Sequence, residues 1–306
     1  MDTKTRVGLI GVGLMGHGIA SNIVKNGYAL SFLDHPGNQP VMDLVARGAN
    51  AVGSATELAA QCDVVVLCVT GTPQVEDVLF RPEGVLAGMK PGMKPGMIVI
   101  DCSTAIPAST RVVAARIVAA GGRFLDAAMT RTPKEAAEGR LNLIVGGPDE
   151  LLREVLPLLR SFAENIVHAG PVSAGHQLKL LHNFVSLGFS AVLAEAAAAA
   201  RRADVPAGVF VEALAKGGGG GVILERMTPF LLADDASGFT FTLANALKDL
   251  TYYNAMTQDL GAVHGVAQAA QALYADAVGQ GHHARPIPEL VAILSEGQIG
   301  SASRES

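Results

Sequence analysis

The chain contains no tryptophan, and only 5% of its 306 residues are aromatic and 17% charged. Hydrophobic residues make up 49% of it. This composition is typical of a soluble globular protein rich in small apolar side chains, and it excludes disorder and a coiled coil for the bulk of the chain. Because domains usually have about 100–200 residues, the length predicts two domains, each with its own core.

Basic charge and cysteine are also scarce. The chain has 23 Lys and Arg against 28 Asp and Glu, so its net charge is -5 and we expect no nucleic-acid partner. Its three cysteines, Cys62, Cys68 and Cys102, are odd in number and lack C-x-x-C spacing. Such a set suits a reducing cytosol better than a disulfide framework or a zinc site. We therefore expect packing cysteines, no bound metal and a cytoplasmic protein.

Long uninterrupted hydrophobic runs are missing too. An apolar stretch follows Lys4 and Arg6 as in a signal peptide, but Gly11, Gly13 and Gly16 interrupt it. No further uncharged run reaches the ~18–20 residues that a membrane span needs. We expect no membrane association.

From about Arg6 to Gly147, short apolar runs alternate with helix-like stretches. This alternation is typical of a parallel sheet buried on both faces, so we predict a doubly wound α/β fold of the Rossmann type. Six runs are strand candidates: VGLIGV from Val7, ALSFLD ending at Asp34, VVVLCV from Val64, MIVIDC ending at Cys102, RFLDA from Arg123 and LNLIVGG from Leu141.

The pattern changes after about Pro171, where long Ala- and Leu-rich helical stretches replace the strands. Five glycines from Gly217 to Gly221, and then Pro229, are expected to break these helices. The first helix, 173–202, would be about 45 Å long at 1.5 Å per residue. We predict a dinucleotide-binding domain at 1–170 and an all-helical domain at 171–300, with a frayed tail from Gly297.

The segment 11–16, GVGLMG, fits G-x-G-x-x-G between the first strand candidate and a helix. Gly11 would allow the tight turn, Gly13 the approach of a pyrophosphate, and Gly16 the packing of helix on strand. Asp34 ends the second strand candidate 18 residues after Gly16, where a carboxylate can bind an adenine ribose. Such a carboxylate repels the 2′-phosphate of NADP, which favours NAD as the cofactor. The competing interpretation of the whole motif is a glycine-rich turn followed by a solvated aspartate.

A narrow polar stripe follows the helix 173–202, which is otherwise apolar on most of its circumference and is therefore expected to be buried. Lys179, Asn183, Ser186 and Ser190 succeed one another at offsets of four, three and four, with His182 beside them. A lysine in an apolar helix must pair, snorkel or face a wet cleft. The pattern alone leaves a structural role and a functional role open.

Three more segments carry polar groups, of which two follow strand candidates. Ligands of open α/β sheets bind at the carboxyl ends of strands. Arg131, between Thr130 and Thr132, could grip an anion, although a loop arginine is commonly solvated. The hydroxyls of Ser103 and Thr104 follow another strand candidate and are expected to point towards the same ligand site, although they could instead cap a helix. Lys248, with Asp249, reads by itself as a solvated charge pair on a helix.

Taken together, the motifs resemble the β-hydroxyacid dehydrogenase family over nearly the whole chain. GLIGVGLMG at 8–16 looks like the family's cofactor fingerprint, DCST at 101–104 like its D-x-S-T segment, GHQLKLLHN at 175–183 like its G-x-x-x-K-x-x-x-N signature, and LKDL at 247–250 like its second-domain lysine motif. The loop 126–132, DAAMTRT, departs from the D-A-P-V-S-G-G of most members and is similar to the sulfolactaldehyde reductase branch.

This resemblance implies a Rossmann domain joined by a long helix to an all-α domain, assembled as a homodimer or homotetramer. Lys179 becomes the general acid/base, and Asn183 positions the lysine and the substrate. The residues expected to bind the cofactor are Gly11, Gly13, Leu14, Met15, Gly16, Asp34, Val69, Thr70, Thr104 and Lys248. Those expected to bind the substrate are Ser103, Thr130, Arg131, Thr132, Lys179 and Asn183.

The sequence thus predicts an NAD-dependent oxidoreductase that interconverts a short anionic 3-hydroxy acid and its semialdehyde. Two alternatives stay open: a catalytically silent NAD-binding protein, and an imine reductase on a related scaffold. Lys179 and Asn183 together disfavour the first, and Lys179 disfavours the second because imine reductases commonly have another residue there.

Overall fold

The computed structural model describes residues 1, 5–89 and 96–297. The chain divides into two compact units, Met1–Lys179 and Leu180–Ser306, and this division falls inside one long helix. The predicted frayed tail lies outside the described residues beyond Gly297.

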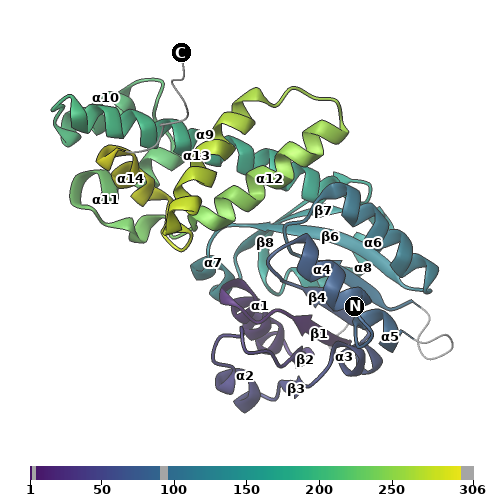
Figure 1. Cartoon of the computed structure of the whole chain (residues 1–306). Coiled ribbons are helices and arrows are strands. Elements are labelled where there is room, and N and C mark those ends of the chain that lie inside the picture. The colour runs from purple at the N-terminus through teal and green to yellow at the C-terminus, as the bar shows by residue number, and fades with distance from the viewer. Residues whose placement is uncertain (2–4, 90–95, 298–306) are drawn as a thin grey trace. The chain divides into compact units, whose positions relative to one another are not determined.

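The first unit contains one eight-stranded sheet with the strand order β3-β2-β1-β4-β5-β6-β7-β8 (Figure 1). All neighbouring strands are parallel except β6 and β7. The strands are β1 Arg6–Ile10, β2 Ala29–Leu33, β3 Asn50–Val52, β4 Val64–Leu67, β5 Ile98–Asp101, β6 Arg123–Thr130, β7 Leu141–Gly146 and β8 Ala163–Gly170. The predicted α/β class and its six strand candidates are confirmed.

The sequence patterns missed two strands. β3 has only three residues, too few for a recognisable pattern. β8 lies at the edge of the sheet and has only one buried residue, so it lacks the apolar run of a buried strand.

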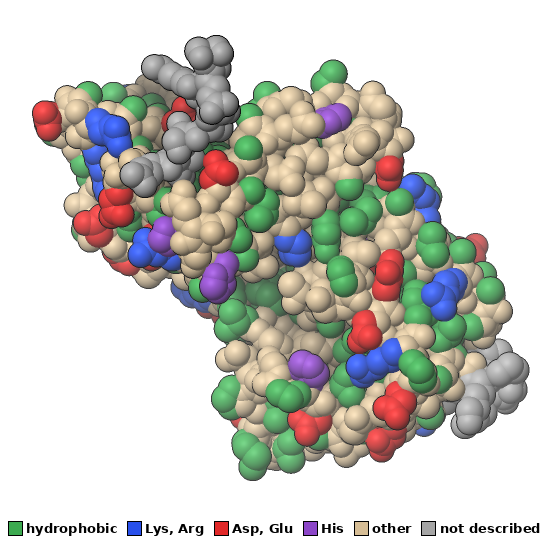
Figure 2. Space-filling view, viewed as in Figure 1, with side chains coloured by type: hydrophobic (Ala, Val, Ile, Leu, Met, Phe, Trp, Pro, Cys, Tyr) green, Lys and Arg blue, Asp and Glu red, His purple; other side chains and the backbone are tan. Residues whose placement is uncertain are grey.

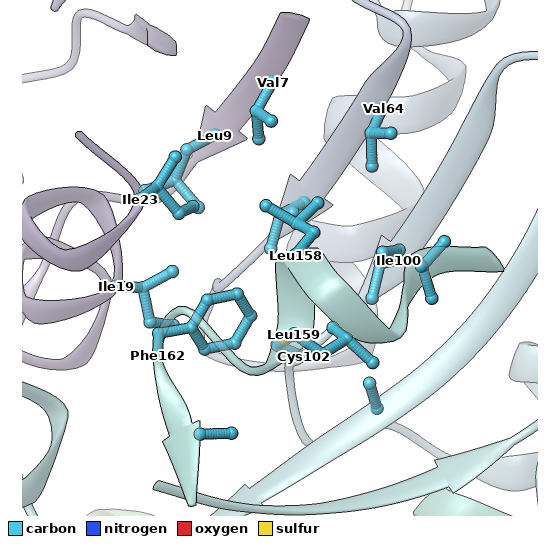
Figure 3. Close-up of a cluster of buried hydrophobic side chains, with 14 of the residues drawn as sticks. Val7, Leu9, Ile19, Ile23, Val64, Ile100, Cys102, Leu158, Leu159 and Phe162 are labelled. Carbon is cyan, nitrogen blue, oxygen red and sulfur yellow. The ribbon is translucent and has the colours of Figure 1, made fainter. Parts of the chain in front are cut away.

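Helices cover both faces of the sheet because successive side chains of a strand point to opposite sides. In β4, Val64 and Val66 belong to one hydrophobic cluster, whereas Val65 and Leu67 belong to the other. Figure 3 shows the first cluster, where α1 and α8 pack on the sheet through Ile19, Ile23, Leu158 and Leu159. The helices of this unit are α1 Leu14–Lys25, α2 Met42–Ala46, α3 Ala55–Gln61, α4 Thr72–Phe80, α5 Val85–Gly88, α6 Pro107–Ala119, α7 Pro133–Ala137 and α8 Asp149–Leu159.

The described part of the second unit is helical, as predicted. Its helices are α9 Ala174–Arg202, which begins in the first unit, α10 Ala207–Lys216, α11 Val222–Ala233, α12 Leu243–Asp259, α13 Gly265–Ala277 and α14 Leu290–Glu296, with short 3-10 or π turns at Ala236–Gly238, Val278–His282 and Ile287–Glu289. The five glycines separate α10 from α11 as expected. Pro229 does not end a helix, because α11 continues through it.

The long helix α9 is the core helix of the second unit, where Leu187, Leu193 and Ala194 join its hydrophobic cluster. By length and composition alone it could cross a membrane, a test that the core helix of a soluble protein also passes. The expected burial of this helix is confirmed for the side that joins the core and is wrong for another side. Leu178, Leu181, Val185 and Val192 are 40–68% exposed and form an apolar stripe at offsets of three, four and seven.

Candidate active site

The glycine-rich turn after β1 has the geometry of a phosphate-binding loop. Gly11 has φ +97°, and a Cβ there would run into the carbonyl oxygen of Cys68. A Cβ on Gly16 would likewise meet the carbonyl oxygen of Gly11. A Cβ on Gly13 would meet nothing within 4 Å, so the protein's own packing does not require this glycine. The space beside Gly13 fits the close approach of a pyrophosphate.

The start of α1 completes this cradle. Gly13 caps the helix, and Leu14 and Met15 begin it, so their backbone N–H groups lie in the first turn, where anions bind. The side chain of Asn38 braces the turn: its Oδ1 accepts the Val12 N–H at 3.2 Å, and its Nδ2 donates to the Leu33 carbonyl at 3.0 Å. Sequence reasoning overlooked Asn38 because it lies in a polar loop without a motif.

Three further predicted cofactor residues lie at the carboxyl ends of the parallel strands. Asp34 directly follows β2; its N–H donates to the Val52 carbonyl at 2.9 Å, and its side chain is exposed. Val69 and the exposed Thr70 follow β4. These positions agree with a dinucleotide lying across the ends of β1, β2 and β4.

Ser103 also lies at the carboxyl ends of the strands, but it is already hydrogen-bonded within the protein. Its Oγ accepts the Val69 N–H at 3.1 Å, and its N–H donates to Asp101 Oδ1 at 2.9 Å. Ser103 is buried, while its neighbour Thr104 is half-buried. Ser103 therefore joins the ends of β4 and β5, and Thr104 is the more accessible hydroxyl.

The loop after β6 is also bonded locally. Thr130 Oγ1 accepts from Asn142 Nδ2 at 3.2 Å, and Thr132 forms a capping box with Glu135 at the start of α7. Arg131 Nη1 pairs with Glu164 Oε2 at 2.5 Å and also donates to the carbonyl of Arg140. The guanidinium is thus engaged at one end, and any substrate anion would have to share it with Glu164.

The polar stripe of α9 combines two kinds of residue. Lys179 and Asn183, one turn apart, are only 8% and 6% exposed. Ser186 and Ser190 return their hydroxyls to backbone carbonyls of the same helix, those of Asn183 and Ser186. The two serines are therefore structural, which leaves Lys179 and Asn183 as the chemically distinctive pair.

Asp249, treated above as half of a solvated charge pair, is in fact buried, with only 2% exposed. Its Oδ2 accepts from Asn183 Nδ2 at 2.5 Å, and its Oδ1 lies 2.8 Å from Lys248 Nζ. Helical periodicity could have revealed this, since position 249 shares a face with the buried residues Ala246 and Tyr253. One carboxylate therefore holds two of the predicted site residues in the second unit.

The cysteine beside the glycine-rich turn is a packing residue. Burial raises the pKa of the Cys68 thiol to about 12, and nearby Asp101 acts in the same direction. Burial likewise raises the pKa of Cys102 well above its usual range. Thiols that stay neutral are poor nucleophiles, so Cys68 and Cys102 do not supply the chemistry of the site.

Two family models account for nearly the whole described chain. The NAD binding domain of 6-phosphogluconate dehydrogenase matches residues 6–170, more than half of the chain, and the model described as the NAD-binding of NADP-dependent 3-hydroxyisobutyrate dehydrogenase matches residues 173–294. The chain belongs to the β-hydroxyacid dehydrogenase family.

Individual relatives and a solved structure agree with this assignment. An NAD-dependent L-serine dehydrogenase of Pseudomonas aeruginosa is 32% identical over 272 residues, which cover 86% of each chain. A 3-sulfolactaldehyde reductase of Escherichia coli K12 is 29% identical over 208 residues, 68% of each chain. The solved structure of a Mycobacterium tuberculosis 3-hydroxyisobutyrate dehydrogenase with L-serine superposes with a TM-score of 0.83 at 26% identity, covering 95% of this chain and 99% of that one.

Membership makes the chain one of a family of soluble NAD(P)-dependent oxidoreductases that act on the CH–OH group of hydroxy acids. It adds to the geometry a cofactor class for the glycine-rich turn.

On the face drawn in Figure 2, acidic and basic side chains are interspersed among the described residues.

Proposed function

We propose that this β-hydroxyacid dehydrogenase uses NAD to interconvert a short anionic 3-hydroxy acid and its semialdehyde, with Lys179 as the general acid/base. The carrying observation is the near-complete burial of Lys179 and Asn183, one turn apart on α9. Burying an ammonium group costs free energy even where the group is paired, and a solvent-facing lysine would serve the helix equally well. The position is therefore better explained by chemistry than by stability.

Each of the two residues has a definite task in this proposal. Lys179 gives a proton to the carbonyl oxygen during reduction and takes it back from the hydroxyl during oxidation. Asn183 has one N–H committed to Asp249 Oδ2, and its second N–H remains to orient a substrate oxygen or the lysine. The nicotinamide, when bound, exchanges the hydride with the carbinol carbon.

The proposed cofactor is NAD rather than NADP. Gly11, Gly13, Gly16 and the first turn of α1 would hold the pyrophosphate, with Val69, Thr70, Thr104 and Lys248 as further contacts. Asp34 carries an exposed carboxylate directly after β2, where it would accept hydrogen bonds from the ribose hydroxyls. The same charge would repel a 2′-phosphate.

The proposed substrate is a small hydroxy acid. Such a molecule has little apolar surface, so most of its binding affinity must come from its anionic group. Ser103, Thr130, Arg131 and Thr132 are proposed to bind that group, with Arg131 shared with Glu164. L-Serine, 3-hydroxyisobutyrate and sulfolactaldehyde, which the names of relatives mention, are small molecules that each contain a carboxylate or a sulfonate group.

We also propose a cytoplasmic homodimer or homotetramer, and a first domain ending at residue 170. The exposed apolar stripe of α9 (Leu178, Leu181, Val185 and Val192) supports self-association, since a soluble monomer gains nothing by exposing it. Sedimentation velocity of the purified protein tests this: an assembly is expected, and a monomer at micromolar concentration contradicts it.

The activity is tested with a panel of 3-hydroxy acids and semialdehydes, both carboxylates and sulfonates, assayed with NAD and with NADP by absorbance at the nicotinamide band. We expect turnover of at least one acid with NAD, and turnover slower by about 100-fold or more in the Lys179→Ala protein. Tight NADH binding without turnover of any member would instead favour a silent NAD-binding protein.

A further inference from the structure

The start of α9 is attached to the sheet by a carboxylate from another element. Asp126, on β6, is fully buried. Its Oδ1 accepts the Ser173 N–H at 2.7 Å, and its Oδ2 accepts the His176 N–H at 2.9 Å. The first N–H groups of a helix lack partners within the helix, so Asp126 caps α9 from the sheet.

A cap from the helix's own sequence is not available here. Ser173 has φ +78°, and its Oγ accepts from Arg111 and from Gln177 at 3.3 Å each. The capping role therefore falls to Asp126. Burial raises the pKa of the Asp126 carboxyl, while His176 and the two N–H donors act in the opposite direction.

Two glycines bring the helix onto the strands at this point. A Cβ on Gly146 of β7 would lie 2.6 Å from Asp126 Oδ1, and a Cβ on Gly175 would lie 2.7 Å from Asp126 Oδ2. The Cβ of Gly175 would also run into the carbonyl oxygen of Ile144. The first turn of α9 thus lies directly against the backbone of β7, with little freedom to move.

His176 supplies a second attachment and is itself fully buried. Its Nδ1 lies 2.8 Å from Thr110 Oγ1 on α6. Its Nε2 makes no hydrogen bond to any described residue and lies 4.0 Å from Asp101 Oδ2. Packing alone would be served by an apolar side chain, so a buried imidazole that meets Thr110 with one nitrogen and lies near Asp101 with the other calls for a further role.

Asp101 connects this attachment to the strand ends proposed to bind the cofactor. Its other oxygen accepts the Ser103 N–H, and Ser103 Oγ in turn accepts the Val69 N–H. One run of contacts therefore leads from Val69 through Ser103 and Asp101 to His176. Lys179 follows His176 by three residues on the same helix.

We propose that Asp126 and His176 are positioning residues that fix the first turn of α9, and with it Lys179, relative to the ends of β4 and β5. The catalytic meaning of this inference rests on the proposed role of Lys179. A displacement of about 1 Å at a proton-transfer group can lower the rate about 100-fold, so a group that fixes the helix acts on kcat without touching the substrate.

Asp126→Asn is the principal test. The asparagine keeps the size of the side chain but presents an NH₂ group to one of the two N–H donors, so the cap is half lost. We expect faster amide hydrogen exchange in the peptide 172–180 and a kcat lowered by about tenfold or more, with the Kd for NADH within about threefold of wild type. Ser161→Ala, which removes a buried hydroxyl elsewhere in the same unit, is the control and should change neither the exchange nor kcat.

His176 gives an independent pair of variants, which serve if Asp126→Asn does not fold. His176→Asn can keep the hydrogen bond to Thr110, whereas His176→Ala cannot. We expect His176→Asn to retain more of the wild-type kcat than His176→Ala, with the same order in protection from exchange. Equal kcat and equal exchange in the two variants overturn the proposal.

Other outcomes also decide the matter. Faster exchange with unchanged kcat in Asp126→Asn makes the cap structural only and overturns the positioning role. Unchanged exchange overturns the cap itself. If the wild-type protein turns over no hydroxy acid, the proposed function fails, and the exchange measurements still decide whether Asp126 and His176 fix the first turn of α9.

Discussion

Arg131 combines a strained backbone with a side chain proposed to bind substrate, and substitution by glycine separates the two. Its φ of +83° lies in the left-handed region, which costs a residue with a Cβ roughly 1–2 kcal/mol. Glycine relieves this strain but loses about 0.5–1 kcal/mol to the greater freedom of the unfolded chain. The partly exposed ion pair with Glu164 contributes about 0–1 kcal/mol more.

Alanine keeps the strain and loses the same ion pair. We therefore expect Arg131→Gly to be more stable than Arg131→Ala by about 0.5–1 kcal/mol, which is a Tm difference of roughly 1–4 °C for domains of this size. Thermal unfolding followed by circular dichroism measures this.

Substrate binding predicts a different pattern for the same variants. If Arg131 holds the acid group, both variants raise KM by roughly two orders of magnitude, whatever their order of stability. Glu164→Gln is the matched control, because it removes the competing carboxylate and leaves the guanidinium; KM should stay the same or fall.

Two results would refute this reasoning. Arg131→Ala at least as stable as Arg131→Gly would remove the argument from backbone strain. Values of kcat/KM within about threefold of wild type for both variants would remove the substrate role and leave Arg131 as the ion-pair partner of Glu164.

Three further predictions concern the remaining site residues. Lys179→Ala should lower kcat by about 10²–10⁴-fold, and Asn183→Ala should lower it less. NADH should still bind to both proteins, as measured by nicotinamide fluorescence. A Lys179→Ala protein that keeps more than about a tenth of the wild-type kcat would assign the proton transfer to another residue. Asp34→Ala should narrow the preference for NAD in steady-state kinetics, because it removes the charge that repels a 2′-phosphate; a wild-type kcat/KM with NADP equal to that with NAD would contradict the argument. Asp249→Asn should lower kcat/KM by about ten- to 100-fold, since Asn183 and Lys248 lose a charged partner; Asp259→Asn, an exposed change on the same helix, should have no effect, and equal results for the two would make Asp249 dispensable.

The sequence by itself determined the elements whose side chains repeat with a clear period. β4 was predictable because Val64 to Leu67 are apolar on both faces, and α9 because its apolar residues recur over eight turns. The glycine-rich turn was predictable for another reason: its conformation depends on backbone geometry that only glycine allows, as the φ of Gly11 shows. The edge strand β8 escaped because neither of its faces is continuously buried.

Tertiary structure decided which polar groups meet. Asp126 lies 47 residues before Ser173, and Asn183 lies 66 residues before Asp249, so no local pattern relates the partners of either hydrogen bond. It also decided that Arg131 is paired, since Glu164 comes from a strand that the sequence did not reveal. Burial sets how much free energy such contacts contribute, and burial is a property of the packed chain. An ion pair such as Lys248–Asp249 contributes little when it is exposed to water. Because Asp249 is buried, its contacts with Lys248 and Asn183 are stronger than the sequence suggested.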